Sequence, residues 1–331
     1  MFYSTCKIKY IIYYLMAAIA ISLISACRQS FLNPALITNC RTIQHAVGKT
    51  CIPPHPQRII VLDTNPLDGV LALGFKPIAA PDFSELSLPE EITQGIISIG
   101  NNSQPNLEEI ARLNPDLIIG LEYSSDSYKQ LTQIAPTILA PGNEKKWKED
   151  LRLYALALNT TQEAEAILQV YNARIKEFRQ RMHHRLKTKT VSLVSTINYG
   201  AGNPARIYLS NSFMGAVITE AGLKLPAAQT TLAPTITNDN WGINISIERL
   251  DLIDGDVIFT INTKPETKQL DSTLSQLQQH PLWSKLDAVK NNRVYTVNYM
   301  VWVAQRNIGG ANRILDDLFK YLVTDEMQDT E

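Results

Sequence analysis

Residues 160–182, TTQEAEAILQVYNARIKEFRQRM, decide how the chain is organised. Thr160 and Glu163 have the spacing of a helix-capping box. From there apolar side chains return every three or four residues, which is the period of one helix face. These apolar positions are Ala164, Ile167 or Leu168, Tyr171, Ile175, Phe178 and Met182. The pattern predicts a helix of about 25 residues, roughly 37 Å long at about 1.5 Å per residue.

The chain on either side of this helix alternates short apolar runs with helical patterns. Before the helix, the alternation opens with a β-branched run at residues 58–63, and after the helix it restarts at Thr190. Alternation of this kind implies parallel strands with helices on both faces. We therefore expect an α/β fold of two Rossmann-like lobes with parallel-type sheets, joined by one long α-helix, with a ligand cleft between the lobes. A coiled-coil dimer through the apolar helix face is the alternative.

The composition is that of an ordinary globular protein. The chain has 331 residues, with 31 Lys and Arg against 32 Asp and Glu, and 45% of its residues are hydrophobic. That length predicts about two domains. The near-neutral charge, without a basic block, lacks the electrostatic footprint of a protein that binds nucleic acid. The four cysteines are too few for a disulfide scaffold.

The first 26 residues have the pattern of a secretory signal. Two lysines are their only charges, and an uncharged, mainly apolar stretch of 17 residues runs from Tyr10 to Ala26. This stretch is shorter than the roughly 20 residues that a membrane-spanning helix needs. Residues 24–27, ISAC, resemble a bacterial lipobox. We therefore expect cleavage before Cys27 and lipidation of that cysteine, with an uncleaved anchor helix as the alternative; both place the body of the protein outside the cytoplasm.

Cleavage at this point changes the cysteine count. Cys27 would carry the lipid, and only Cys40 and Cys51 would remain in an oxidising compartment, which favours a disulfide between them. The residues between these two cysteines alternate and include Gly48, which predicts a hairpin. A metal site that adds His45 to the two cysteines fits no zinc spacing and is not expected.

The sequence divides into five segments on this basis. They are a signal peptide (1–26), the lipidated cysteine with a tether and the hairpin (27–56), an N-terminal α/β lobe (57–158), the long linking helix (159–189) and a C-terminal α/β lobe (190–331). Without the signal peptide, 29 basic residues face 32 acidic ones, so the mature protein would be mildly acidic.

The sequence contains no common catalytic signature. It has no P-loop, no GxSxG elbow and no HExxH motif. Residues 200–205, GAGNPA, match a dinucleotide fingerprint in letters, but a strand-like run follows where that fingerprint needs a helix. The five histidines are scattered, which disfavours a receptor with three histidines on a metal. We therefore expect no enzymatic activity, no cofactor and no metal site.

Two segments repeat the order helix, turn and strand. Residues 105–119 read PNLEEIARLNPDLII, and residues 245–259 read ISIERLDLIDGDVIF. Each places an acid, Glu108 or Glu248, in its first helical turn, where the helix dipole favours negative charge. Stabilisation of the helix is one role for these acids, and contact with a partner is the other.

These segments, the lipobox, the PQRII run at residues 56–60 and the long helix resemble the periplasmic binding proteins of ABC importers for ferric siderophores and vitamin B12. The resemblance covers nearly the whole mature chain. It implies that Glu108 and Glu248, one in each lobe, dock onto arginines of the importer permease, because rim charges set orientation and association rate. We expect a monomer, held by its lipid at the membrane of the periplasm or cell envelope.

The ligand would be held by aromatic and charged side chains at strand ends and in loops. We expect six of them: Tyr123, Tyr199, Arg206, Trp241, Trp302 and Arg306. Trp241 is similar to a ligand-packing tryptophan of the ferric-hydroxamate branch of the family, with a core position as the alternative. Arginine forks match carboxylates, so Arg206 and Arg306 suit an anionic, citrate-type complex, although arginines of this kind are more often surface residues than ligand contacts. Residues 101–104, NNSQ, stand where the hydroxamate branch carries an arginine, which departs from that branch.

The sequence therefore predicts a substrate-binding protein that captures a ferric siderophore, of the citrate or hydroxamate type, and delivers it to an ABC importer. The siderophore would fill the coordination of the iron, so the protein would recognise the shape and charge of the chelate. A corrinoid or haem receptor of the same class is one alternative. An extracytoplasmic enzyme on the same scaffold is the other, but it would need convergent catalytic groups that the sequence does not show.

Overall fold

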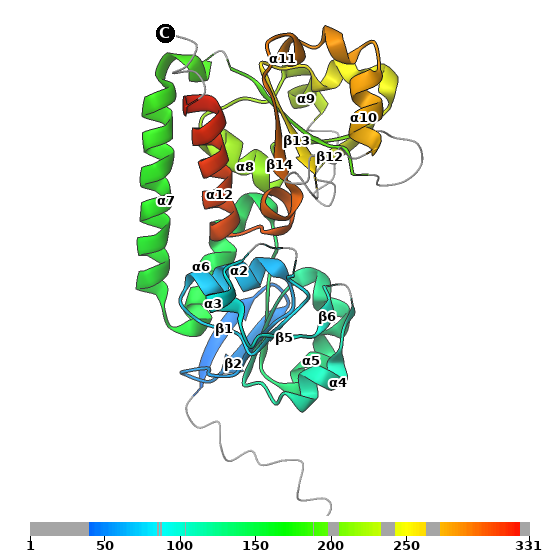
Figure 1. Cartoon of the computed structure of the whole chain (residues 1–331). Helices are drawn as coiled ribbons and strands as arrows, with labels where there is room; N and C mark the ends of the chain where they lie inside the picture. The colour runs from blue at the N-terminus through cyan, green and yellow to red at the C-terminus, as the bar shows by residue number, and fades with distance from the viewer. Residues whose placement is uncertain are drawn as a thin grey trace, which may run out of the picture. The chain divides into compact units, whose positions relative to one another are not determined.

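The computed structural model describes residues 40–84, 86, 88–102, 104–187, 189–197, 205–232, 242–262 and 272–324 (Figure 1). The described residues from Thr42 onward belong to one compact unit. The predicted signal peptide and lipidated Cys27, together with Tyr199 and Trp241, lie outside the described residues. No helix within the described ranges is both long enough and apolar enough to cross a membrane.

The N-terminal lobe is built on a five-stranded parallel sheet. Its strands stand in the order β5-β4-β3-β8-β9, and every neighbouring pair is parallel. The bounds are β3 Ile59–Val61, β4 Ala79–Ala80, β5 Ile97–Ser98, β8 Leu117–Leu121 and β9 Thr137–Ala140. Ile59 and Val61 belong to the main hydrophobic core, whereas Ile60 between them belongs to a second core. Because successive strand residues point to opposite faces, both faces of this sheet are covered.

Short helices and two hairpins surround this sheet. The helices are α2 Thr64–Ala72, α3 Glu90–Thr93, η2 Glu122–Ser127, α4 Leu107–Arg112 and α5 Tyr128–Ile134, of which η2 is a 3-10 helix. The hairpins pair β1 Arg41–His45 with β2 Gly48–Ile52, and β6 Gly100–Asn101 with β7 Gln104–Pro105. Gly48 has a φ of +143°, which a glycine adopts without strain. The predicted hairpin is therefore present, and Cys40 and Cys51 are both disulfide-bonded.

The C-terminal lobe has a five-stranded sheet of mixed direction. The order is β12-β11-β10-β13-β14, and β11 is antiparallel to both of its neighbours, while β10, β13 and β14 are parallel. The bounds are β10 Val191–Ser195, β11 Ala205–Tyr208, β12 Gly242–Ile245, β13 Val257–Asn262 and β14 Val294–Asn298. Four of the five strands therefore run in one direction, as the expected parallel-type sheet requires, and only β11 among the strands of this sheet runs against them. The stretch between β10 and β11 is shorter than the dozen or so residues that a parallel crossover needs.

Helices form much of the chain between the strands of this second sheet and after its last strand. They are α8 Phe213–Glu220, α9 Ala227–Leu232, η6 Ile247–Ile253, α10 Ser272–Gln279, η8 Trp283–Lys285, α11 Asp287–Lys290, η9 Met300–Ala304, α12 Ile308–Phe319 and η10 Lys320–Thr324. The segment between η9 and α12 carries one of the predicted ligand residues, Arg306.

Two successive helices link the lobes. α6 (Trp147–Leu158) follows the turn η3 (Glu144–Lys146), and α7 (Thr161–Met182) is followed by the turn η4 (His183–Lys187). α7 has 22 residues, slightly fewer than the roughly 25 that its apolar repeat predicts. The buried positions of α7 are those of the predicted apolar stripe, with Leu168 rather than Ile167 as its fully buried member.

The apolar stripe of α7 is covered by other helices of the same chain. The ring of Tyr171 lies 5.3 Å from that of Trp147 in α6, and its hydroxyl donates to Glu220 of α8 at 2.8 Å. Phe178 meets Phe319 of α12 edge-on, with ring centroids 5.4 Å apart. Figure 1 shows α7 and α12 running side by side. The coiled-coil alternative is excluded, because this face is already occupied within the chain.

Helix α2 of the N-terminal lobe is hydrogen-bonded to the start of α12 in the C-terminal lobe. The Asp68 carboxylate accepts from the backbone N–H groups of Gly309 at 2.8 Å and Gly310 at 3.2 Å, and from the Gln305 side chain at 2.7 Å. An acid at this position satisfies N–H groups that a helix leaves unpaired. The bonds fix residues 304–310 against the N-terminal lobe.

Candidate functional site

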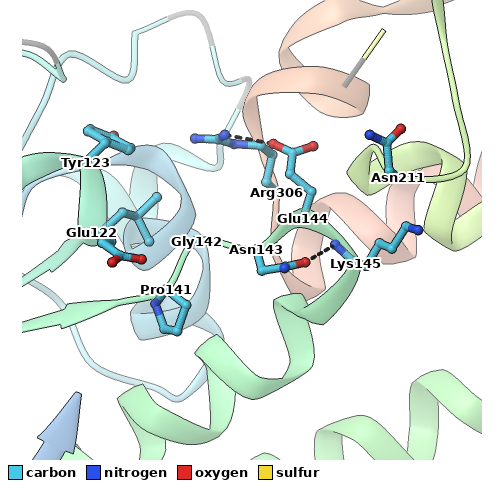
Figure 2. Close-up of a pocket in the computed structure, with 10 residues that line it drawn as sticks. Glu122, Tyr123, Pro141, Gly142, Asn143, Glu144, Lys145, Asn211 and Arg306 are labelled. Carbon is cyan, nitrogen blue, oxygen red and sulfur yellow. Dashed lines mark hydrogen bonds and ion pairs between the residues drawn. The ribbon is translucent and has the colours of Figure 1, made fainter. Parts of the chain in front are cut away.

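The described residues form a cavity of about 720 Å³ at the carboxyl edge of the N-terminal sheet. Its wall consists of residues 121–123 at the end of β8, residues 141–145 after β9, and Asn211 and Arg306 from the C-terminal lobe (Figure 2). In open α/β sheets, ligands bind beyond the carboxyl ends of the strands. The position and the volume are those of a small-molecule site.

Arg306 lies at the centre of the polar wall of this cavity. Its guanidinium donates to Glu144 Oε1 at 2.9 Å and to Asp63 Oδ1 at 3.3 Å. Only 14% of the Arg306 side chain is exposed, against 1% for Asp63 and 5% for Glu144. Burial would lower the pKa of Arg306, but the charges of Asp63 and then Glu144 outweigh it and raise that pKa. Arg306 is therefore a permanently charged group held by two carboxylates of the other lobe.

The two carboxylates are themselves fixed by the backbone. Asp63 follows β3 and caps α2, since its side chain accepts from the Asn65 N–H at 2.7 Å. Glu144 Oε2 accepts from the Phe213 N–H, 2.8 Å away at the start of α8. Each acid thus sits at a helix N-terminus, where the dipole stabilises a negative charge.

Tyr123 belongs to the same cluster. Its hydroxyl donates to Asp63 Oδ2, which also accepts from the Asn102 amide at 2.8 Å. Burial of the hydroxyl, and next the charge of Asp63, raise the pKa of Tyr123, so this side chain is neutral. The residue as a whole is nevertheless 51% exposed. Its hydroxyl is therefore anchored while ring carbon faces the cavity, and the NNSQ segment reaches the site through Asn102.

The backbone of Arg306 is held by a buried amide network. Asn65 donates from Nδ2 to the Arg306 carbonyl at 3.0 Å, and its Oδ1 accepts from the Tyr154 hydroxyl at 2.9 Å and from Asn307 at 3.0 Å. Asn65, Tyr154 and Asn307 are all buried. The position of Arg306 is thus set by contacts between α2, α6 and the chain before α12.

A further acid lies behind the cavity wall. Asp150 of α6 is 1% exposed, and neither of its oxygens has a well-formed hydrogen bond in the described part of the chain. Burial raises the pKa of Asp150 to about 7, an effect that the Gly142 N–H and the charge of Arg306 only partly oppose. The described residues include no group of three or more His, Cys, Asp or Glu side chains that could hold a metal ion.

The structure brings two of the six predicted ligand residues together. Tyr123 and Arg306 both line the cavity. Arg206 lies on β11, where it donates to Asn244 of β12 at 3.1 Å, and it is not among the residues of the cavity wall. Tyr199 and Trp241 lie outside the described residues.

Trp302 is a core residue and does not line the cavity. Its side chain is fully buried, with its ring 4.9 Å from that of Phe259, and its Nε1 donates to Asp317 at 2.7 Å. The prediction of a ligand contact for Trp302 is therefore wrong. The sequence places this tryptophan near Arg306, but the indole fills the core of the lobe and its one polar atom is satisfied there.

The two predicted docking acids are exposed, one on each lobe. Glu108 lies in the first turn of α4 and Glu248 in that of η6, and neither has an ion-pair partner among the described residues. A hydrogen bond from Ser246 lowers the pKa of Glu248. The neighbouring Glu109, by contrast, pairs with Arg112 at 2.5 Å. Within the PNLEE segment, Glu108 is thus the acid left open to solvent.

Asp63 and Glu144 are not singled out by the sequence patterns. A usable signal is nevertheless present, because Asp63 is the first polar residue after the β3 run and Glu144 follows β9 within a short loop. The carboxyl ends of parallel strands meet at one edge of a sheet, so polar residues just after such strands are candidates for a site.

Comparison with known proteins places this architecture in a family. Residues 59–299 match a family of the description "Periplasmic binding protein". The chain belongs to the periplasmic binding protein family. The Probable siderophore-binding lipoprotein YfiY of Bacillus subtilis (strain 168) is 31% identical over 320 residues, which cover 94% of this chain and 96% of that protein. The Fe(3+)-citrate-binding protein YfmC of the same organism is 28% identical, with 85% of each chain covered.

A solved structure supports the same assignment. Staphylococcus aureus SirA complexed with staphyloferrin B is 26% identical and superimposes with a TM-score of 0.73, covering 85% of this chain and 98% of that chain. The protein is therefore an extracytoplasmic substrate-binding protein and not an enzyme. Its two lobes, with sheets of mostly parallel strands, are those of its family.

Proposed function

We propose that this protein captures a ferric siderophore of the citrate or hydroxamate type and delivers it to an ABC importer. The observation that carries the proposal is the cavity at the sheet edge, where Tyr123 of one lobe and Arg306 of the other line one wall. The similarity of the chain to the probable siderophore-binding lipoprotein YfiY, which extends over 94% of the chain, supports a siderophore as the cargo. The siderophore would complete the coordination of the iron, so the protein would supply shape, aromatic surface and hydrogen bonds.

The cavity wall offers the groups that such a chelate needs. The exposed ring carbon of Tyr123 provides apolar surface in a fixed position, because its hydroxyl is bonded to Asp63. Asn143 and Asn211 provide amides, and the exposed Lys145 provides a cation at the same wall. A rigid aromatic surface with a few convergent polar groups is the usual composition of a small-molecule site.

Titration of the purified protein with ferric chelates tests this proposal. We expect ferric citrate, hydroxamate and catecholate complexes to be distinguished by quenching of tryptophan fluorescence, with at least one binding in the nanomolar-to-micromolar range. Tyr123→Ala should weaken that binding by about tenfold, whereas Tyr123→Phe, which keeps the ring, should weaken it less. A flat signal with every complex would refute the proposal, and binding of haem or cobalamin alone would favour the alternative receptor class.

We further propose that Glu108 and Glu248 dock the loaded receptor onto cationic loops of the permease. Both carboxylates are exposed, lie on different lobes and have no ion-pair partner among the described residues. Two such charges, one in each lobe, would fix the orientation of the receptor on the importer.

Matched pairs of variants separate docking from general charge effects. Glu108→Ala and Glu248→Ala should abolish uptake of the chelate by cells and leave its binding in solution unchanged. Glu109→Ala and Asp251→Ala are the controls, because each removes an acid beside the docking residue that is already paired, with Arg112 or Arg249. Equal loss of uptake in the controls, or loss of binding in the docking variants, would contradict the assignment.

The segment boundaries and the membrane anchor are also proposals. We propose that residues 1–26 are removed, that Cys27 carries the lipid, and that Cys40 and Cys51 bridge the hairpin before the lobes at 57–158 and 190–331. Mass spectrometry of the protein from membranes should find a lipidated N-terminal Cys27. Cys27→Ala should release the protein from the membrane, and retention of this variant would favour the uncleaved anchor.

A further inference from the structure

Among the described residues, the charged side chains at the cavity wall do not form a cationic site. Of the described wall residues, Glu122 and Glu144 are acids, and Lys145 and Arg306 are bases. Asp63 adds a third carboxylate directly against Arg306. Among these described residues the acids therefore outnumber the bases, whereas recognition of a polyanion requires an excess of positive charge.

Arg306 is the cation with the least freedom to change partners. One nitrogen bonds to Glu144 and the other to Asp63, and the Arg306 carbonyl is held by Asn65 at 3.0 Å. Figure 2 shows Arg306 and Glu144 facing each other across the wall. Removal of one partner from a buried ion pair leaves an uncompensated buried charge. This arrangement therefore resists replacement of Glu144 or Asp63 by a carboxylate of a ligand.

A ligand carboxylate that approached Arg306 would also come close to Asp63 and Glu144, which carry the same negative charge. It could bond to Arg306 only alongside Glu144 and Asp63, and like charges in contact oppose binding strongly. The exposed ring of Tyr123 is uncharged, so its contact with a ligand does not depend on the charge of that ligand. A ferric complex in which three hydroxamate groups neutralise the iron carries no net charge and avoids the repulsion.

We propose that Asp63 and Glu144 determine specificity, by neutralising Arg306 internally and so disfavouring chelates that carry several free carboxylates. The preferred cargo is a ferric siderophore of low net charge, held mainly by hydroxamate groups, instead of a polyanionic citrate complex. This inference rests on the proposed function and narrows it, because it selects between the two siderophore types at the same cavity.

Binding constants for two probes of different charge test the inference. The probes are ferrichrome, a neutral ferric trihydroxamate, and ferric dicitrate, a polyanion. The wild-type protein should bind ferrichrome more tightly by about tenfold or more. Glu144→Gln should narrow that ratio by about tenfold, because it removes one of the two charges that neutralise Arg306. Glu163→Gln is the control, since it removes an exposed acid of α7 that does not line the cavity, and it should change the ratio by less than about threefold.

A second variant guards against a folding defect in the first. Asp63→Asn keeps an oxygen that can cap α2 and removes the charge on the other side of Arg306, so it should shift the ratio in the same direction as Glu144→Gln. Tighter wild-type binding of ferric dicitrate, or a ratio unchanged in both variants, would overturn the inference while leaving the receptor function intact. Absence of binding to every ferric chelate would instead refute the proposed function, and this inference with it.

Discussion

Asp150 shows how burial changes the chemistry of one side chain. Its pKa is about 7 in the folded protein, against an ordinary value of 3.8, because its oxygens are buried without strong hydrogen bonds. The folded protein therefore keeps a proton that the unfolded chain has lost between these two pH values. The free energy of unfolding thus falls as pH rises through this window, by up to roughly 4 kcal/mol once the pH exceeds the folded pKa.

Asp150→Asn should remove this pH dependence. We expect the variant to be more stable than the wild type at about pH 8, where the buried carboxylate is charged, and the gain to shrink as the pH falls to about 3, below the ordinary pKa of 3.8, where Asp150 is mostly neutral in both states. Urea unfolding across this range measures the difference. Glu163→Gln, which changes an exposed acid of α7, is the control and should show no such trend. A gain of equal size at both ends of the range would show that titration of Asp150 is not its cause.

The sequence predicts some of the residues at the cavity wall, but it does not predict their interactions with one another. Tyr123 and Arg306 could be predicted because an aromatic and a guanidinium near strand ends are typical of ligand sites. Trp302 could not be distinguished from them, since the sequence does not show whether an indole faces a cavity or the core. The roles of Asp63 and Glu144 depend on a guanidinium from the other lobe, about which local patterns contain no information.

At the scale of elements, α7 is stabilised by what its apolar face contacts. Phe178 is fully buried against Phe319, whereas Val170 of the same helix is 62% exposed. Phe178→Ala should therefore lower the free energy of unfolding by about 3–5 kcal/mol, because it removes a buried ring and leaves a cavity. Val170→Ala, in the same helix, should change it by less than about 0.5 kcal/mol. Chemical denaturation measures both, and similar losses in the two variants would contradict the packing described for α7.

Periodicity predicts elements well where one face is buried locally. α7 follows from its apolar repeat, and the hairpin of β1 and β2 follows from alternation and a glycine. Strand direction is a different matter. The antiparallel direction of β11 depends on the length of the connection after β10 and on the strand with which β11 pairs. The run Arg206–Leu209 by itself is compatible with either direction.

At the scale of the whole molecule, the two lobes are joined by more than the linking helices. One hydrophobic core includes Val61 and Leu67 of the N-terminal lobe and Phe259 of the C-terminal lobe. Buried polar contacts add to it, since Asp68 bonds to the start of α12 and Asn65 bonds to the chain before it. The lobes are thus coupled by apolar and polar contacts that would have to break together.

This coupling predicts that the protein unfolds in one cooperative step. Calorimetry should give equal calorimetric and van't Hoff enthalpies for the wild type, as for a single domain. Gly309→Ala places a methyl group against the Asp68 carboxylate and should displace it from α12, which lowers Tm and separates the transition into steps. Gly255→Ala, whose methyl group would meet Pro226 and Thr190 at 3.3 Å within one lobe, should keep a single transition. Two resolved transitions in the wild type would show that the polar contacts between α2 and α12 do not couple the lobes.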